Sequence, residues 1–246
     1  LDTTNVIFLG ASNTVEEITS VPRNGSYITY LRSLNPTWKG VNLIDKAISG
    51  WGVANYYGEV TLINETVFEN SPDYVVIVLG GNDFLRAISA DRFEIRYRWL
   101  LDALILLDTQ SDIKEIFLAN IFWGTIELDE IRTSVFKQFQ EIIANASRDY
   151  EFPLLDFFNT TENRPEFYVD NIHLNDLGHQ AIAITVDETI RPYLLGNMSR
   201  TAEFSKITEI YTNTYTENSP GFALTSAVFI LLAITKIRKK KLKKTN

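Results

Sequence analysis

The sequence predicts an α/β fold in which helices cover both faces of a parallel β-sheet. Short apolar runs rich in β-branched residues alternate with longer stretches of helical periodicity from residue 6 to about residue 195. The apolar runs are nearly continuous, as strands buried on both faces are. Strand–helix alternation of this kind is typical of parallel sheets with helices on both sides. A length of 246 residues and 45% hydrophobic residues suffice for one such domain with additional segments.

Five strands are predicted, at residues 6–9, 41–48, 74–79, 113–120 and 153–157. Three long helices are predicted between and after them. The first spans about 91–107, and the third begins at the N-cap residue Asn175 and ends near Pro192. The second spans about 128–150 and places five apolar residues on one face: Ile131, Val135, Phe139, Ile142 and Ile143.

The end of the chain differs from this domain, which we expect to span residues 1–197. Residues 198–219 are rich in Thr, Ser, Glu and Asn and indicate a linker or stalk. Residues 220–237 contain an apolar run, and residues 238–246 form a basic tail. The run is short for a spanning helix, and a surface or buried helix is the alternative interpretation. Because it has no polar face and precedes a cationic cluster, we expect a membrane segment with a cytoplasmic tail and the domain of residues 1–197 at the cell surface.

The charge distribution argues against a nucleic-acid partner. Seven of the 23 basic side chains lie in residues 236–246, so the rest of the chain carries 16 basic and 31 acidic side chains. An acidic body repels phosphate backbones. The absence of cysteine excludes disulfides, thiol catalysis and cysteine-ligated metals. The chain begins at Leu1, and no signal peptide is recognisable in front of the first strand.

Polar or glycine-rich motifs follow three of the predicted strands, at the sheet edge where such folds place their sites. Ser12 follows the first strand, Gly50 and Trp51 follow the second, and Asn82 with Asp83 follows the third. Serine and asparagine supply a nucleophile and an amide donor, and glycine brings backbone N–H groups close to a ligand. Each motif taken alone also suits a helix cap or a strand-ending turn.

The fourth motif is Asp170-x-x-His173, which lies just before the last predicted helix. A carboxylate three residues away can hold one imidazole nitrogen and leave the other as a base. A metal pair or a loop hydrogen bond is the alternative, but no third ligand is apparent. The other histidine, His179, lies on the helix and is interpreted as structural or as part of the rim of the site.

The order and spacing of these four motifs resemble the SGNH hydrolases, also called GDSL esterases and lipases. The resemblance covers about residues 5–195 and implies a three-layer α/β/α sandwich with a flavodoxin-like, five-stranded sheet. It implies that Ser12, Asp170 and His173 are catalytic and that Ser12, Gly50 and Asn82 form an oxyanion hole, without a cofactor or metal. The family's aspartate before the serine is Ala11 here, and the common D-G-x-H-P-N sequence is D-N-I-H-L-N.

We expect Trp51 and Asp83, which lie beside these residues, to bind substrate, with the Trp51 ring narrowing the acyl pocket in favour of acetyl groups. The resemblance implies hydrolysis of carboxylic esters through an acyl-enzyme on Ser12, with small-molecule or cell-surface glycan esters as substrates. An acyltransferase, a lipase or thioesterase, and a catalytically silent surface-binding domain are the alternatives. The sequence Pro220-Gly221-Phe222, followed by apolar and then basic residues, also resembles the archaeal PGF-CTERM sorting signal, which implies a sortase-like processing enzyme as a partner.

Overall fold

A computed structural model describes residues 3–15, 25–108 and 113–199 of the chain. The predicted stalk, apolar segment and basic tail lie outside these residues from position 200 onward. Five parallel strands form one sheet in the order β2-β1-β3-β4-β5. They are β1 Thr4–Leu9, β2 Val41–Asp45, β3 Tyr74–Ile77, β4 Glu115–Ala119 and β5 Leu154–Leu155. All five predicted strands are confirmed, and the sheet is the one that the resemblance implies.

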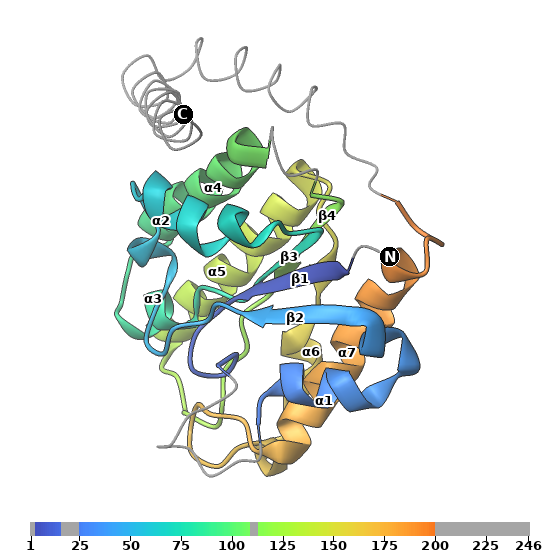
Figure 1. The fold of residues 1–246 in the computed structure, drawn as a ribbon. Helices are drawn as coiled ribbons and strands as arrows, with labels where there is room; N and C mark the ends of the chain where they lie inside the picture. The colour runs from blue at the N-terminus through green and yellow to red at the C-terminus, as the bar shows by residue number, and fades with distance from the viewer. Residues whose placement is uncertain (1–2, 16–24, 109–112, 200–246) are drawn as a thin grey trace.

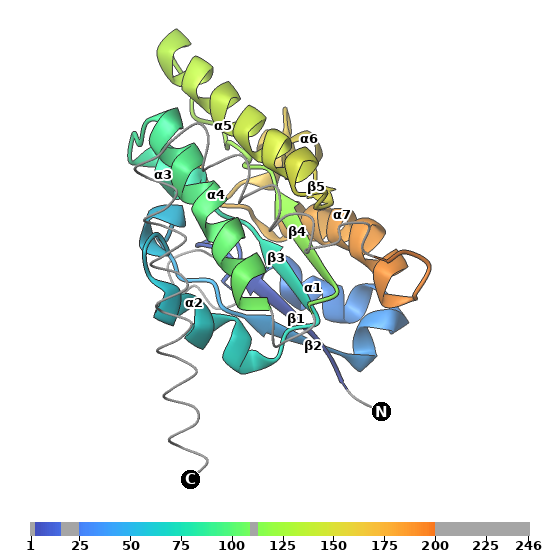
Figure 2. The same ribbon diagram turned by 90° about the horizontal axis from the view of Figure 1, so that it is seen from above.

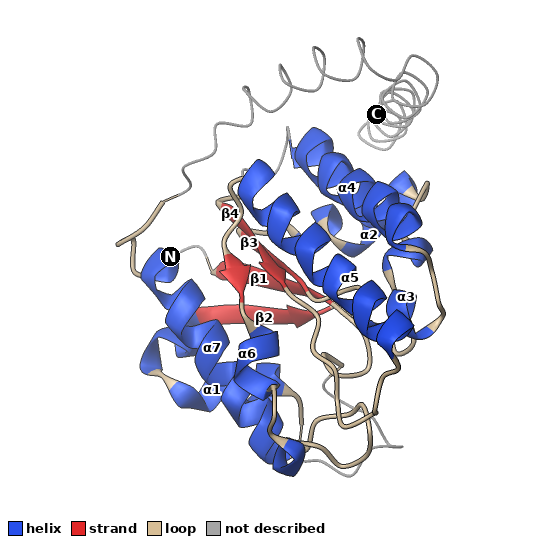
Figure 3. Ribbon diagram, turned by 180° about the vertical axis from the view of Figure 1, so that it is seen from behind, coloured by secondary structure: helices blue, strands red, loops and turns tan. Residues whose placement is uncertain are grey.

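Helices cover both faces of this sheet, so that the domain has three layers (Figure 1). Figure 3 shows the sheet from behind, with one group of helices on either side of it. The first group comprises α2 Val60–Thr66, α3 Gly81–Leu85, α4 Ala90–Leu107 and α5 Glu130–Asp149. The second comprises α1 Tyr27–Leu34, α6 Phe157–Thr161 and α7 Asp176–Leu194.

The alternation of side chains along β1 explains the two cores. Ile7 and Leu9 point to one face and pack in the cluster that contains residues of α4 and α5. Val6 and Phe8 point to the other face and pack in the cluster that contains residues of α1 and α7. All four side chains are buried completely. Successive residues of a strand point to opposite faces, so a strand covered on both sides must be apolar at every position.

The long helices agree with the prediction except at their ends. The side chain of Asn175 caps α7 by accepting from the N–H of Gly178, and α7 continues two residues beyond Pro192 to Leu194. Ile131 was expected on the buried face of α5, but it is 76% exposed. The first turns of α5 extend beyond the other described helices (Figure 2), which agrees with the exposure of Ile131. In the part of the chain that the structure describes, no helix is both long and apolar enough to cross a membrane.

Candidate active site

Ser12 lies in a tight turn that follows β1. The N–H groups of Thr14 and Val15 donate to the carbonyl of Ala11, at 2.8 and 3.1 Å. The turn needs a glycine at position 10, because a Cβ atom there would lie 2.2 Å from the hydroxyl oxygen of Thr14. The turn therefore holds Ser12 at the carboxyl edge of the sheet, where ligands bind in open α/β folds.

His173 lies in the loop between the 3₁₀ turn Pro165–Phe167 and α7. An isolated bridge pairs Tyr168 with Leu174, and the N–H of Val169 donates to the carbonyl of His173 at 2.9 Å. Oδ1 of Asp170 accepts from the N–H groups of Ile172 and His173, at 2.8 and 2.6 Å. These bonds fold the loop into a turn that keeps the Asp170 carboxylate beside the imidazole.

The imidazole of His173 lies between the side chains of Ser12 and Asp170 and is hydrogen-bonded to both. Its Nε2 lies 3.1 Å from Oγ of Ser12, and its Nδ1 lies 2.7 Å from Oδ2 of Asp170. Partial burial raises the pKa of Asp170, but hydrogen bonds from His173 and from the loop N–H groups outweigh it, so that the pKa lies below its ordinary value. The carboxylate is therefore ionised at neutral pH and favours the tautomer of His173 that carries its proton on Nδ1.

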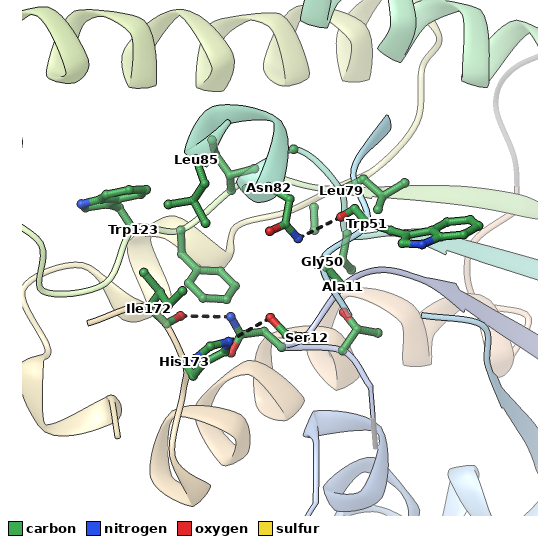
Figure 4. Close-up of a pocket in the computed structure, with 18 of the residues that line it drawn as sticks. Ala11, Ser12, Gly50, Trp51, Leu79, Asn82, Leu85, Trp123, Ile172 and His173 are labelled. Atoms are coloured by element: carbon green, nitrogen blue, oxygen red, sulfur yellow. Dashed lines mark hydrogen bonds between the residues drawn. The ribbon is translucent and has the colours of Figure 1, made fainter. Parts of the chain in front are cut away.

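Asn82 and Gly50 lie across the pocket from His173 (Figure 4). Asn82 belongs to the first turn of α3, and its Nδ2 donates to the carbonyl of Trp51 at 2.9 Å. Gly50 has a φ of +81°, a left-handed conformation that favours glycine. Its carbonyl accepts from Arg86 at 2.7 Å. The structure thus places Ser12, Gly50, Asn82 and His173 around one pocket.

The pocket has a volume of about 210 Å³ and is open to solvent. Its walls come from the loops that follow four strands and from the His173 loop: residues 11–14, 49–51, 78–82, 119–124 and 172–173, with Leu85. The segment after β4, with Phe122 and Trp123, is absent from the predicted site. Its position after a strand was a usable signal, but its apolar residues suggested packing rather than a ligand.

Asp83 is expected from the sequence to bind substrate, but the structure places its side chain in the interior and outside the lining of the pocket. It is 0% exposed, and its carboxylate accepts from the N–H groups of Val53 and Ala54, at 2.9 and 3.2 Å. Gly52 packs directly against it, since a Cβ atom on Gly52 would lie 2.1 Å from Oδ2 of Asp83. Asp83 therefore supports the loop that carries Gly50 and does not face the pocket.

Trp51 lines the pocket, but its ring does not narrow the space beside Ser12. In Figure 4 the indole points away from Ser12 and His173. It packs edge-on against the buried Tyr56, with ring centroids 5.4 Å apart. The control of acyl size by this ring stays a prediction, and the ring's position beside Tyr56 does not support it. His179 is buried completely and stacks on Tyr27 at 6.4 Å, which agrees with a structural role.

Within the described residues, no three His, Asp or Glu side chains are close enough together to hold a metal ion. The groups around the pocket are a hydroxyl, an imidazole with an ionised partner, and N–H donors. These are the groups that acyl transfer requires.

Comparisons with known proteins give the same fold. Residues 8–181 match the model of the GDSL-like lipase/acylhydrolase family. The acetylxylan esterase Axe2 from Geobacillus stearothermophilus superposes with a TM-score of 0.61 and 20% identity, covering 75% of this chain and 93% of that one. The acetyl xylan esterase AlAXEase superposes with a TM-score of 0.60 and 24% identity, covering 75% and 98%. A sequence comparison with curated proteins gave no significant match.

Proposed function

The chain belongs to the GDSL-like lipase/acylhydrolase family and is an ester-bond hydrolase, and on this premise we propose that it forms an acyl-enzyme on Ser12. The observation that carries the proposal is the position of the His173 imidazole, between the hydroxyl of Ser12 and the carboxylate of Asp170. Nε2 removes the hydroxyl proton as Oγ attacks the ester carbonyl, and Asp170 stabilises the imidazolium that forms.

The developing oxyanion needs hydrogen-bond donors that are already in place. We assign this role to the backbone N–H groups of Ser12 and Gly50 and to the side-chain amide of Asn82. The tetrahedral intermediate then collapses, and His173 gives its proton to the leaving alcohol. Water, with His173 again as base, attacks the acyl-enzyme and releases the carboxylic acid with Ser12 restored.

The pocket favours a small, uncharged acyl ester. Its volume of about 210 Å³ is below the roughly 300–1,000 Å³ of pockets that enclose drug-sized ligands. Its described lining contains no Asp, Glu, Lys or Arg side chain. Such a lining provides no counter-charge for a phosphorylated substrate or an anionic thioester. Because two structural relatives are acetylxylan esterases, we propose O-acetyl groups on glycans as the substrates.

We further propose that the enzyme acts at the cell surface. The apolar run within residues 220–237 and the basic residues after it support a C-terminal membrane anchor with the catalytic domain outside. The resemblance of Pro220-Gly221-Phe222 and its surroundings to a PGF-CTERM signal supports processing by a sortase-like enzyme. An external location suits a glycan substrate that is attached to a cell or lies outside it.

The proposed chemistry is tested by trapping and by mutation. After brief mixing with p-nitrophenyl acetate and acid quenching, peptide mass spectrometry should find an acetyl group on Ser12. Ser12→Ala and His173→Ala should lower kcat by similar large factors, and the double variant should be hardly worse than either, because both remove the same proton-transfer step. His179→Ala serves as the histidine control outside the pocket. An acetyl group elsewhere, or additive losses in the double variant, would refute the mechanism.

A further inference from the structure

The distance between the Ser12 and His173 side chains depends on two loops that are far apart in sequence. The two residues are separated by 161 positions, yet Nε2 and Oγ lie 3.1 Å apart. His173 belongs to neither a helix nor a strand. The bonds within residues 168–174 give the His173 loop its shape, but they do not determine how far the loop lies from β1. The segment after β4 contacts the His173 loop at Asn171, but only a contact between the Ser12 and His173 loops fixes the distance between these two residues directly.

Asn13, the residue next to Ser12, makes that contact with both ends of its side-chain amide. Its Nδ2 donates to the carbonyl of Ile172 at 3.0 Å, and its Oδ1 accepts from the N–H of Leu174 at 2.9 Å. One of these bonds is the dashed line that ends on Ile172 in Figure 4. The two peptide groups flank His173 on either side, so the amide is bonded to the backbone as a neighbouring strand would be.

This arrangement needs a side chain with a donor and an acceptor in one plane, which asparagine provides. Aspartate has nearly the same shape and keeps the acceptor for Leu174. It has no donor for the carbonyl of Ile172 and would place a negative oxygen against it. Alanine loses both bonds. The chemistry of the contact is therefore specific to the amide and not to the size of the residue.

We propose that Asn13 is a positioning residue that holds the His173 backbone at the distance where Nε2 reaches the Ser12 hydroxyl. The proposal rests on the function proposed above for Ser12 and His173. Asn13 acts only through His173, so its effect on the reactivity of Ser12 should disappear when the imidazole is absent. A residue that merely stabilises the fold would have the same effect with and without the imidazole.

The test measures the rate at which a fluorophosphonate probe labels Ser12 in the full-length chain, because slow reactions can be followed over hours. Asn13→Asp should lower this rate by about 10- to 100-fold, the range expected for a misplacement of about 1 Å. In a His173→Ala background, the same substitution should change the rate by less than about twofold. Asn13→Ala should behave in the same way, and the melting temperature of each variant verifies that it is folded.

Asn175→Asp is the matched control. Asn175 lies two residues after His173, and its Nδ2 donates to a backbone carbonyl, that of Glu166, at 2.7 Å. Like Asn13→Asp, the substitution removes one hydrogen bond from an amide to a backbone carbonyl and adds one negative charge. It keeps the side-chain oxygen that caps α7. Its labelling rate should stay close to that of the unmodified protein.

Two results would overturn the proposal: an unchanged rate in both Asn13 variants, or equal losses with and without His173. Failure of the underlying function gives a different pattern. In that case His173→Ala would not slow labelling, or the probe would still label Ser12→Ala. The two failures are therefore distinguishable within one set of variants.

Discussion

At the scale of single residues, the amide of Asn82 has two N–H groups, and one of them already has a partner. It donates to the carbonyl of Trp51, in the segment that also carries Gly50. This bond orients the amide plane before substrate arrives, and the proposed mechanism assigns the second N–H to a ligand in the pocket that Asn82 lines. Donors that need no reorientation during the reaction are the ones that stabilise a developing charge best.

We predict that Asn82→Ala lowers kcat by about 10²–10³ and leaves KM nearly unchanged, because the donor acts on the transition state. Steady-state kinetics on p-nitrophenyl acetate measures both constants. Asn55→Ala is the control, since Oδ1 of Asn55 also bonds this segment, accepting from the N–H of Gly52 at 2.9 Å. It should change kcat by less than tenfold. Equal losses in the two variants would show that Asn82 only supports the loop.

At the scale of elements, two residues of α3 and its C-cap residue Arg86 hold the loop of residues 50–54. Asn82 bonds Trp51, Arg86 bonds Gly50, and Asp83 accepts from Val53 and Ala54. One short helix therefore supplies a donor to the pocket and also positions the backbone of Gly50. The buried carboxylate of Asp83 is the component of this support that titrates.

We predict a pH-dependent stability difference between the native protein and Asp83→Asn. Burial raises the pKa of Asp83 above its ordinary value of 3.8, although hydrogen bonds from Val53 and Ala54 lower it in part. At pH values between 3.8 and the raised pKa, Asp83 keeps its proton in the native state and has lost it in the unfolded state. Its free energy of unfolding therefore falls as the pH rises through that window, and Asp83→Asn lacks this contribution.

The measurement is urea unfolding of both proteins at intervals between about pH 4 and pH 7. The free energy of unfolding of the native protein, minus that of the variant, should decrease as the pH rises and then become constant. A difference that increases with pH would mean that the carboxylate is stabilised, not destabilised, by its surroundings.

The loop after β4 contacts the His173 loop directly, and the hydroxyl of Tyr168 donates to the carbonyl of Trp123 at 3.3 Å. Thr125 donates two hydrogen bonds to Asn171. Its N–H donates to the Asn171 carbonyl at 3.0 Å, and its hydroxyl donates to Oδ1 of Asn171 at 3.1 Å. A Cβ atom on Gly124 would lie 1.8 Å from that carbonyl oxygen. Only glycine lets the two loops approach so closely.

Gly124→Ala should therefore displace the segment that carries Asp170 and His173. We predict a loss of at least about tenfold in kcat/KM and of about 1–3 kcal/mol in the free energy of unfolding. Gly40→Ala is the matched control, because a Cβ atom there meets nothing within 4 Å. Unchanged kinetics in Gly124→Ala would mean that the loop adapts without moving the imidazole.

The elements that could be predicted from the sequence are those with a strong pattern. The five strands and the long helices α4, α5 and α7 carry continuous or periodic apolar residues. The helices α3 and α6, of five residues each, are too short for a period to emerge. Ser12, Gly50 and Asn82 were predictable because they follow strands. The contacts of Asn13, Asp83 and Gly124 were not, because each depends on a partner segment that local sequence does not reveal.

At the scale of the whole molecule, we predict that the full-length chain fractionates with membranes in its own host. The reason is the apolar run within residues 220–237, followed by basic residues that we expect to stay on the cytoplasmic side. A chain that ends at Asn197 should be found in the soluble fraction and should keep its esterase activity.

A chain that ends at Ser219 is the control, because it keeps the predicted stalk and lacks only the apolar run and the tail. It should also be soluble. Full-length protein found only in the cytosol, or membrane binding by the chain that ends at Ser219, would contradict the predicted anchor.

The position of His173 near the end of the domain sets the order in which activity can arise during synthesis. Ser12 leaves the ribosome first, and a nascent chain that has emerged through β5 already contains all five strands. It still lacks the imidazole, which arrives with α7, the helix that packs beside α1 against the same face of the sheet. Closing so long a loop is slow compared with local folding. On the proposed mechanism, esterase activity in a refolding or translation experiment should therefore report the docking of the His173 loop and α7, and a nascent chain that ends before His173 should not hydrolyse esters.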